Sequence, residues 1–456
     1  MYKKILIASL ALIAGLASCK KDDPTPSPNP PSALTIDGVA STLEFYQLDT
    51  AHLSVAGVAK DAAAKAVWVV NGAKAAEGAT FDFTTAHPGK YEITLTVDGK
   101  SAKQTYTVAP RFSEGAFLLN EGNFGNETGS LTYIHPSKKL VIDQAYYRVN
   151  GTKLGNVCQD LAFGNDQIYI LSQLGPKNGG EGLLTIARSN SLEKVKVYND
   201  EALAQSTPTH IAVLRDHIYI RTERDGILRG SSEGGFTPIT GTKKALKQRM
   251  AQIGERLFAL TSDSKVLMIQ GAQVIRELDL SPAKPSGIAV SHDGKLWVST
   301  TSPNAILKVD PTPDNFVALD THILDKSISA TGPESWQRTT SSAFFAHGDK
   351  LYFTGQSSVI YCHDFATSKT SQVIDVKTID GVGTSANKYY NSLGVDPATG
   401  ELYYAAFEDY STYNKKNVTM VLKADGTKLL LKEKVNSFPA GFYFIPNAAS
   451  RTGANR

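Results

Sequence analysis

The sequence predicts an all-β protein in which a small β-sandwich is followed by a seven-bladed β-propeller. The main observation is a repeated pattern, in which apolar residues flank an aromatic one after a polar turn. Its central aromatics are spaced by 39 to 55 residues: Phe117, Tyr169, Tyr219, Phe258, Trp297, Tyr352 and Tyr403. Seven all-β units of about 40–50 residues are typical of a propeller. A second observation, strict apolar alternation over residues 91–97 before Asp98-Gly99, predicts a hairpin in the sandwich.

The chain of 456 residues begins with a segment that we expect to lie outside both folds. Lys3 and Lys4 precede a mostly apolar run over residues 5–16, which is typical of a signal peptide and too short for a stop-transfer helix. Residues 16–19, Leu-Ala-Ser-Cys, resemble a bacterial lipobox. The resemblance implies that residues 1–18 are a lipoprotein signal peptide and that the thiol of Cys19 is lipidated. The alternative is an ordinary secretory signal with a chance cysteine.

Residues 19–32 are predicted to form a lipidated, proline-rich tether. Five prolines between positions 24 and 31 favour a stiff, extended spacer with no core to bury. The Lys-Lys-Asp-Asp run at 20–23 resembles the surface-export signal of lipoproteins in Bacteroidetes-type bacteria. This implies a lipid-anchored position in the outer membrane, exposed at the cell surface. Cys158 and Cys362 are too few for a disulfide framework, and we expect both to be unpaired and buried.

Residues 33–109 are predicted to form the sandwich. A strand-like run around Trp68 leads into the turn Asn71-Gly72, and the alternating run 91–97 follows a second turn. The stretch from Trp68 to Val97 resembles a PKD-like or Ig-like domain. Such modules usually act as spacers, so the resemblance implies a spacing role.

Residues 112–447 are predicted to form the propeller, with four strands, A to D, in each blade. In six of the seven repeats a short apolar strand and a polar turn precede the aromatic strand, which is therefore strand B. The first repeat lacks this lead-in before Phe117, and the apolar run 440–444 ends the repeats without a following partner. We therefore expect residues 440–444 to become strand A of the first blade. Closing the ring in this way protects edges that would otherwise stay unpaired.

One face of the predicted ring concentrates side chains suited to binding. Strands A and B are antiparallel neighbours, so the loops leaving B and the loops entering A lie on the same face. These loops are rich in amides, which both donate and accept, and in aromatics with a polar tip. The alternative for any one of them is packing between blades. The candidate ligand-binding residues are Asn120, Glu121, Asn123, Phe124, Gln159, Asp160, Trp336, Arg338, Tyr389, Tyr390, Asn391, Tyr410 and Tyr413.

Two stretches resemble a known family. Residues 118–125, Leu-Leu-Asn-Glu-Gly-Asn-Phe-Gly, and residues 154–161, Leu-Gly-Asn-Val-Cys-Gln-Asp-Leu, are similar to the YncE-like propellers of Bacteroidetes surface lipoproteins. The resemblance covers about residues 112–447, and the domain at 33–109 departs from the plain propeller. It implies non-catalytic capture of cobalamin, or a related corrinoid, on the propeller face. It also implies transfer to a TonB-dependent outer-membrane transporter, with no metal or cofactor of the protein's own.

Three other functions stay open on the sequence alone. The same amides and aromatics suit a glycan, and a broad propeller surface suits a protein-binding scaffold. Propellers also host hydrolases and lactonases, and Glu121 or Glu127 with Asp160 would supply the paired carboxylates of glycosidase chemistry. The sequence shows no nucleophile elbow and no zinc-type histidine cluster. A net charge of +3 gives no reason to expect nucleic acid, and membrane association is expected through the lipid anchor only.

Overall fold

The computed structural model describes residues 33–40, 44–328, 342–355, 357–389 and 391–446. The chain divides into two compact units. The first contains Ala51–Phe83 and Tyr91–Tyr106, and the second contains Thr107–Arg456 with Glu44–Thr50 and Thr84–Lys90. None of the helices in the described ranges combines the length and the apolar character needed to cross a membrane.

The N-terminal sandwich consists of two sheets with an aromatic core. The smaller sheet has the order β1 (Thr35–Gly38), β3 (Thr50–Ala56), β6 (Thr80–Thr84). The larger has the order β2 (Phe45–Tyr46), β8 (Lys100–Ala109), β7 (Gly89–Val97), β4 (Val67–Val70), β5 (Ala73–Glu77). The short helix α1 (Lys60–Ala63) precedes β4. Between the sheets, the ring centroids of Trp68 and Phe81 lie 5.6 Å apart, as do those of Phe83 and Tyr106. Burying these large rings stabilises the pair of sheets, as the predicted sandwich requires.

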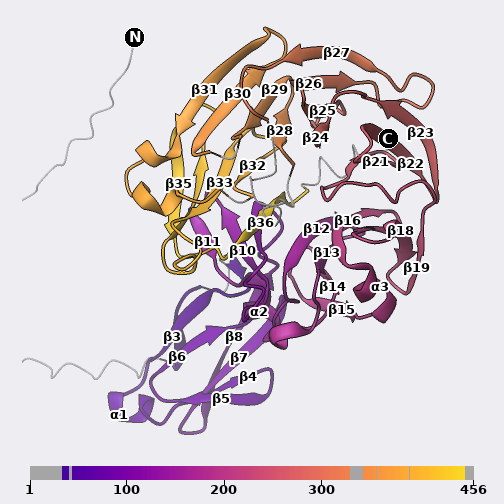
Figure 1. The fold of residues 1–456 in the computed structure, drawn as a ribbon. Coiled ribbons are helices and arrows are strands. Elements are labelled where there is room, and N and C mark those ends of the chain that lie inside the picture. The colour runs from indigo at the N-terminus through magenta and orange to yellow at the C-terminus, as the bar shows by residue number, and fades with distance from the viewer. Residues whose placement is uncertain (1–32, 41–43, 329–341, 356, 390, 447–456) are drawn as a thin grey trace, which may run out of the picture. The chain divides into compact units, whose positions relative to one another are not determined.

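The second unit is a propeller with seven four-stranded sheets among the described residues (Figure 1). Figure 1 shows strand A of each sheet near the centre of the ring and strand D at its rim. From inside to outside the blades are: blade 1, β36 (Pro439–Phe444), β9 (Ala116–Asn120), β10 (Ser130–His135), β11 (Leu140–Ile142); blade 2, β12 (Cys158–Gly164), β13 (Gln167–Ser172), β14 (Leu184–Arg188), β15 (Lys194–Tyr198); blade 3, β16 (Pro208–Leu214), β17 (His217–Thr222), β18 (Gly226–Ser231), β19 (Gly234–Pro238); blade 4, β20 (Ala251–Ile253), β21 (Arg256–Leu260), β22 (Lys265–Gln270), β23 (Gln273–Asp279); blade 5, β24 (Pro285–Val290), β25 (Leu296–Thr301), β26 (Asn304–Val309), β27 (Ala318–Ile323); blade 6, β28 (Phe344–His347), β29 (Lys350–Phe353), β30 (Val359–Asp364), β31 (Lys369–Asp375); blade 7, β32 (Leu393–Val395), β33 (Leu402–Phe407), β34 (Asn417–Leu422), β35 (Lys428–Glu433).

The predicted aromatic of every repeat lies in the second strand of its blade and is buried. This holds for Phe117, Tyr169, Tyr219, Phe258, Trp297, Tyr352 and Tyr403. Each second strand is flanked by two others of its sheet, so its side chains fill the spaces between neighbouring blades. The repeat pattern of the sequence therefore marks the interior of the propeller, and the predicted fold class is confirmed.

The last strand of the chain closes the ring, as predicted. In blade 1, β36 pairs antiparallel with β9, so that Phe442 lies opposite Leu118 and Phe444 opposite Ala116. This pairing gives β9 a neighbour on both sides, because β10 pairs with its other edge. Closure thus removes an open sheet edge that would otherwise be available for aggregation.

We call the face that carries the loops from strand B to C, and from strand D to the next strand A, the upper face. It also carries the short helices of the propeller's described part: α2 (Ala145–Asn150), α3 (Glu201–Ser206) and the 3-10 turns η1 (Lys177–Gly179), η2 (Val376–Thr378) and η3 (Gly383–Ala386). The connections of the opposite face are mostly tight turns. The upper face therefore holds most of the irregular chain, in which binding residues are usually found.

Candidate functional site

A pocket of about 710 Å³ opens among loops of the upper face. This volume falls in the range of small-molecule sites. Its lining comes from blades 3 to 6: Arg221, Lys243, Lys244, Ala245, Leu246, Lys247, Gln248, Ser262, Pro285, Ser286, Thr301, Asn304 and Ser327. Backbone turns and polar side chains provide most of this surface, with Leu246 and Pro285 as its larger apolar members.

The topology explains why residues so far apart in sequence meet here. The stretch 243–248 lies in the connection from β19 of blade 3 to β20 of blade 4. Ser262 follows β21, Thr301 ends β25 and Asn304 begins β26, so these three belong to B-to-C turns. Ser327 lies in the connection after β27. Each of these segments is a loop of the upper face, so adjacent blades bring them together.

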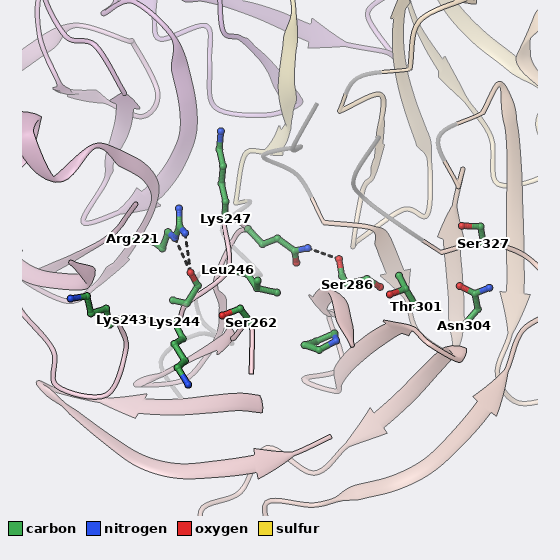
Figure 2. A pocket seen from close by; sticks show the side chains of 13 residues that line it. Arg221, Lys243, Lys244, Leu246, Lys247, Ser262, Ser286, Thr301, Asn304 and Ser327 are labelled. Carbon is green, nitrogen blue, oxygen red and sulfur yellow. Dashed lines mark hydrogen bonds between the residues drawn. The ribbon is translucent and has the colours of Figure 1, made fainter. Parts of the chain in front are cut away.

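The pocket lining contains four cationic residues and no carboxylate among its described members. Arg221 is buried, and its guanidinium donates to the carbonyl oxygen of Ala245 at 2.9 Å (Figure 2). The carboxylate of Glu223 lies 3.1 Å from the Nη1 of Arg221, and the carboxylate of Asp263 lies 2.9 Å from the Nζ of Lys244. Neither carboxylate belongs to the pocket lining. Lys243 and Lys247 complete the set.

Gln248 brings a buried polar atom to the same site. Its Nε2 donates to the carbonyl oxygen of Ser286 at 2.5 Å, which fixes the orientation of the amide. Its Oε1 is buried and has no hydrogen-bond partner among the described residues. The hydroxyl of Ser286 is engaged elsewhere, with the carbonyl oxygen of Ile328 at 2.9 Å. Buried carbonyl oxygens are normally satisfied, so Oε1 is one of several exceptions among the described side chains.

The predicted residues of the Asn-Glu-Gly-Asn stretch lie at the loop after β9. Asn120 is buried and donates to the hydroxyls of Ser130 and Thr132 at 3.2 and 3.3 Å. Glu121 is buried as well, whereas Phe124 is 63% exposed, with the Nζ of Lys177 3.7 Å from its ring centroid. Phe124 is therefore the large apolar side chain of this stretch that is exposed to solvent.

The turn after β9 depends on a glycine with a positive φ and on hydrogen bonds to the backbone. Gly122 has a φ of +74°, and a Cβ at that position would collide with the carbonyl of Thr128. The side chain of Asn123 accepts from the backbone N–H of Gly125 at 2.8 Å, and Asn156 donates to the carbonyl oxygen of Asn123 at 3.2 Å. The sequence motif therefore encodes a compact, glycine-dependent loop that joins blades 1 and 2 at the upper face.

An aromatic group at blades 7 and 1 contains two further predicted residues. Tyr413 lies 4.3 Å from Phe438 between ring centroids, and Tyr410 stacks on Phe438 at 6.0 Å. The hydroxyl of Tyr413 donates to Glu127 at 3.0 Å, and Ser437 donates to the same carboxylate oxygen at 2.7 Å. These contacts join the B-to-C loops of blades 7 and 1.

Three predicted residues lie deeper in the ring. Asp160, on β12, is buried and accepts from the backbone N–H of Ile211 at 2.9 Å. Burial raises the pKa of the Asp160 carboxyl above its ordinary value, although the nearby Arg249 guanidinium opposes that shift. Gln159 is buried on the same strand, and Asn391 is buried just before β32 and donates to the carbonyl oxygen of Pro439 at 2.9 Å.

Of the remaining predicted residues, one packs in an apolar cluster and the others lie outside the described part of the chain. Tyr389 is half-buried and packs against the apolar cluster of blades 6 and 7. Trp336, Arg338 and Tyr390, like the lipidation candidate Cys19, lie outside the described residues. None of the described candidates lines the pocket, although they belong to the same face or to the inner strands beneath it.

The stretch 243–248 is the part of the site that the sequence analysis missed. Its signal is three lysines within five residues, Lys243-Lys244-Ala245-Leu246-Lys247, directly before the first strand of blade 4. Residues 243–247 contain none of the amides and aromatics that mark the predicted binding loops, so the sequence pattern did not single them out. No group of three or more His, Cys, Asp and Glu side chains in the described part of the chain is placed to hold a metal ion. The arrangement is suited to hydrogen bonding and charge attraction.

Comparisons with known proteins agree with the architecture. A family model described as "Domain of unknown function (DUF5074)" matches residues 114–446, which span the propeller. A search of curated proteins finds no match.

Three of the similar solved structures are as follows. A quinonprotein alcohol dehydrogenase-like protein from Bacteroides thetaiotaomicron is 16% identical with a TM-score of 0.56, over 91% of this chain and 97% of that chain. A protein from Lactobacillus plantarum is 13% identical with a TM-score of 0.47, over 73% and 99%. BamB from Moraxella catarrhalis is 12% identical with a TM-score of 0.36, over 60% and 76%. At these identities, the likeness to the Bacteroides protein concerns the fold alone.

Proposed function

The chain belongs to the family described as Domain of unknown function (DUF5074), and from that premise we propose that its propeller captures a small polar nutrient without chemical change. The pocket of about 710 Å³ on the upper face carries this proposal. It is large enough for a small molecule and lined by hydrogen-bonding side chains held on a rigid ring. Its described lining offers no carboxylate that could act as a general acid or base.

Cobalamin, or a related corrinoid, is the leading specific ligand. The support is the resemblance of residues 118–125 and 154–161 to cobalamin-capturing surface propellers. A corrin is a flat macrocycle ringed by carboxamide arms, so it needs many donors and acceptors around a wide mouth. Gln248 and Asn304 supply amides in the pocket, and the exposed ring of Phe124 supplies an apolar plate on the same face.

The proposed setting is the cell surface. The lipobox-like sequence at Cys19 and the tether over residues 19–32 would anchor the protein in the outer membrane by lipid alone. The propeller would then hand its ligand to a TonB-dependent transporter in that membrane. The domain at 33–109 would act as a spacer between anchor and propeller.

A glycan is the second candidate ligand, and a specific observation favours it. Five lining side chains are hydroxyls or a short amide: Ser262, Ser286, Thr301, Asn304 and Ser327. Such groups pair readily with sugar hydroxyls, since each can donate and accept. Capture for a transporter is compatible with either ligand.

Isothermal titration calorimetry of the full-length protein in detergent tests the proposal. The ligands are cyanocobalamin, maltooligosaccharides and, as a comparison, haem. We expect one-to-one binding of cyanocobalamin that weakens in Asn304→Ala and in Asn123→Ala. Asn315→Ala is the matched control, because Asn315 lies between β26 and β27 on the opposite face. Absence of heat with cyanocobalamin would remove this ligand, and absence of heat with both ligand classes would contradict capture of such nutrients.

A further inference from the structure

We propose that two copies of this chain pair through β27, the outermost strand of blade 5, as antiparallel edge strands about a two-fold axis at Thr321. Figure 1 shows β27 at the rim of the propeller. The pairing goes beyond the proposed capture of a nutrient and does not depend on it, because it concerns the rim and not the upper face. Three properties of β27 support it: apolar exposure, an unprotected open edge, and a sequence that matches its own reversed copy.

β27 and the residue before it present apolar side chains to solvent. Val317, Leu319 and Ile323 are 42%, 55% and 66% exposed, and they are three of the six large apolar side chains that are exposed among the described residues. His322 is the half-buried residue of β27, and its ring stacks on Phe365 with centroids 3.7 Å apart. Single exposed apolar residues are ordinary, whereas a group of them in one short segment indicates a contact surface.

The outer edge of β27 is open to a further strand. β27 is the last strand in the order of its sheet, so no strand of the described residues pairs with this edge. The backbone N–H of Leu324 donates inward to the carbonyl oxygen of Asn304 at 2.8 Å. Backbone groups alternate between the two edges of an antiparallel strand, so those of Thr321 and Ile323 point outward. The register with β26 is regular over residues 320–323, which keeps Thr321 within an uninterrupted stretch of strand.

The other outer strands carry features that oppose edge pairing, and β27 lacks them. Edge strands are usually protected by lysine or another charge, by proline, or by short length. β11 has three residues, and β19 ends at Pro238. The remaining four each contain a basic residue: Lys194 in β15, Arg276 in β23, Lys369 in β31 and Lys428 in β35. β27 contains no lysine, arginine or proline, so it is the outer strand of the described blades best suited to pairing.

The sequence of β27 matches its own antiparallel copy in one register. With Thr321 on the two-fold axis, Leu319 lies opposite Ile323 of the second copy. Asp320 then lies opposite His322 of the second copy, a carboxylate against a ring that can donate. Apolar pairs, threonine pairs and pairs of opposite charge are all favourable across strands. An axis at Asp320 would instead place two carboxylates opposite each other, and an axis at His322 two imidazoles. The charge pattern therefore selects Thr321 as the centre.

Sedimentation velocity of the full-length protein in a density-matched detergent tests the pairing. We expect a reversible equilibrium of monomer and dimer with a dissociation constant on the order of 10 µM, because an interface built on one strand is small. A protein that stays monomeric at about 200 µM would overturn the proposal and leave the edge to a strand from a different protein.

Charged variants at the axis test the register. Thr321→Lys and Thr321→Glu each place like charges opposite each other, so each should weaken self-association by about tenfold or more. A mixture of the two variants should regain the dimer, because a lysine then lies opposite a glutamate. Thr237→Lys is the matched control and should leave the dimer unchanged, since Thr237 is an exposed threonine of the outer strand β19. Self-association that survives Thr321→Lys, or a mixture that does not recover it, would overturn the proposal.

A cross-link locates the axis without added charge. Residues opposite each other in a hydrogen-bonded antiparallel pair have Cα atoms about 5.5 Å apart, which a disulfide can span. Thr321→Cys should therefore form a covalent dimer under mild oxidation, seen on a non-reducing gel. Thr237→Cys is the control, and it also reports any reaction of the native Cys158 and Cys362, which both variants retain. Equal cross-linking of the two variants, or none in Thr321→Cys, would contradict an axis at Thr321.

Discussion

The guanidinium of Arg249 meets the carboxylate of Asp160 inside the ring, with Nε 3.2 Å from Oδ1. The hydroxyl of Tyr443 donates to the same oxygen at 2.7 Å, and the backbone N–H of Ile211 donates to the other oxygen at 2.9 Å. Tyr443 belongs to blade 1, Asp160 to blade 2 and Ile211 to blade 3, while Arg249 lies just before blade 4. One carboxylate therefore links the inner edges of four consecutive blades.

Breaking this link from either side should destabilise the propeller strongly. We expect Asp160→Asn and Arg249→Met each to lower the free energy of unfolding by about 3 to 5 kcal/mol, because each leaves a buried polar partner uncompensated. The double variant should lose less than the sum of the two. Urea denaturation of the three variants and the wild type gives the coupling energy. Strictly additive losses would show that the two side chains act independently.

Gly441 packs against the same arginine, and a side chain at this position is expected to destabilise the protein. It has a φ of +144°, and a Cβ built there would collide with the guanidinium of Arg249. We predict that Gly441→Ala destabilises the protein by about 1 to 3 kcal/mol, through backbone strain and overpacking. Combining it with Arg249→Ala should make the added alanine less costly. Thermal unfolding would check this, and a Gly441→Ala protein with an unchanged melting temperature would contradict it.

A pair of histidines joins β27, the outermost strand of blade 5, to β30, the third strand of blade 6. The Nδ1 of His322 lies 2.9 Å from the Nε2 of His363, whose Nδ1 lies 2.9 Å from the hydroxyl of Thr370. Asp320 is 3.5 Å from the other ring nitrogen of His322. Burial, and then the neighbouring His322, lower the pKa of His363, whereas Asp364 opposes the shift.

The contact should weaken in acid. A lowered pKa means that the folded state favours neutral His363, so the stabilisation is complete above the unfolded value of 6.5 and is lost as pH falls below it. We predict a melting temperature that is level from pH 8 to 7 and falls between pH 6.5 and 5. His363→Gln should flatten that fall. The matched control is His52→Gln, because His52 is an exposed histidine of the sandwich. An equal acid dependence in wild type and His363→Gln would contradict the assignment.

The two cysteines of the propeller should be unreactive in the folded protein. Both are free: Cys158 is buried, and Cys362 is half-buried. Burial raises the pKa of the Cys158 thiol far above its ordinary value, and raises that of Cys362 to about 11. Since the thiolate is the nucleophile, neither should react quickly at pH 8. Titration with a chromogenic disulfide in a Cys19→Ser background should count both thiols only after denaturant is added. A fast native equivalent would contradict this.

The sequence was sufficient for the architecture because the architecture repeats. Aromatics such as Tyr169 and Trp297 recur at blade spacing and lie in the second strand of each blade. The absence of a lead-in before Phe117, together with the surplus strand around Phe442, was enough to predict the closure by β36. Such patterns are local, and periodicity reports them directly.

The candidate site depends on contacts that periodicity does not report. Lys247 and Asn304 line one pocket because two blades place their loops side by side, although the residues lie in different repeats. Asp160 was predicted at the binding face from its neighbours in sequence, while its partners Tyr443 and Arg249 are 283 and 89 residues away. Its ligand-binding role, like those of Asn123 and Tyr410, stays a prediction.

The pairing of β36 with β9 can form only after β36, the last strand of the propeller, has been synthesised. Phe442 of β36 lies opposite Leu118 of β9. During translation β9 therefore leaves the ribosome first and has no partner on this edge until β36 has been made. Until then, each growing chain presents an open template for strand addition, and contacts so distant in sequence form slowly. A chain interrupted anywhere before Pro439 never acquires this neighbour for β9. The fold therefore distinguishes finished from unfinished translation products, which gives cellular proteases a clear basis for removing the latter.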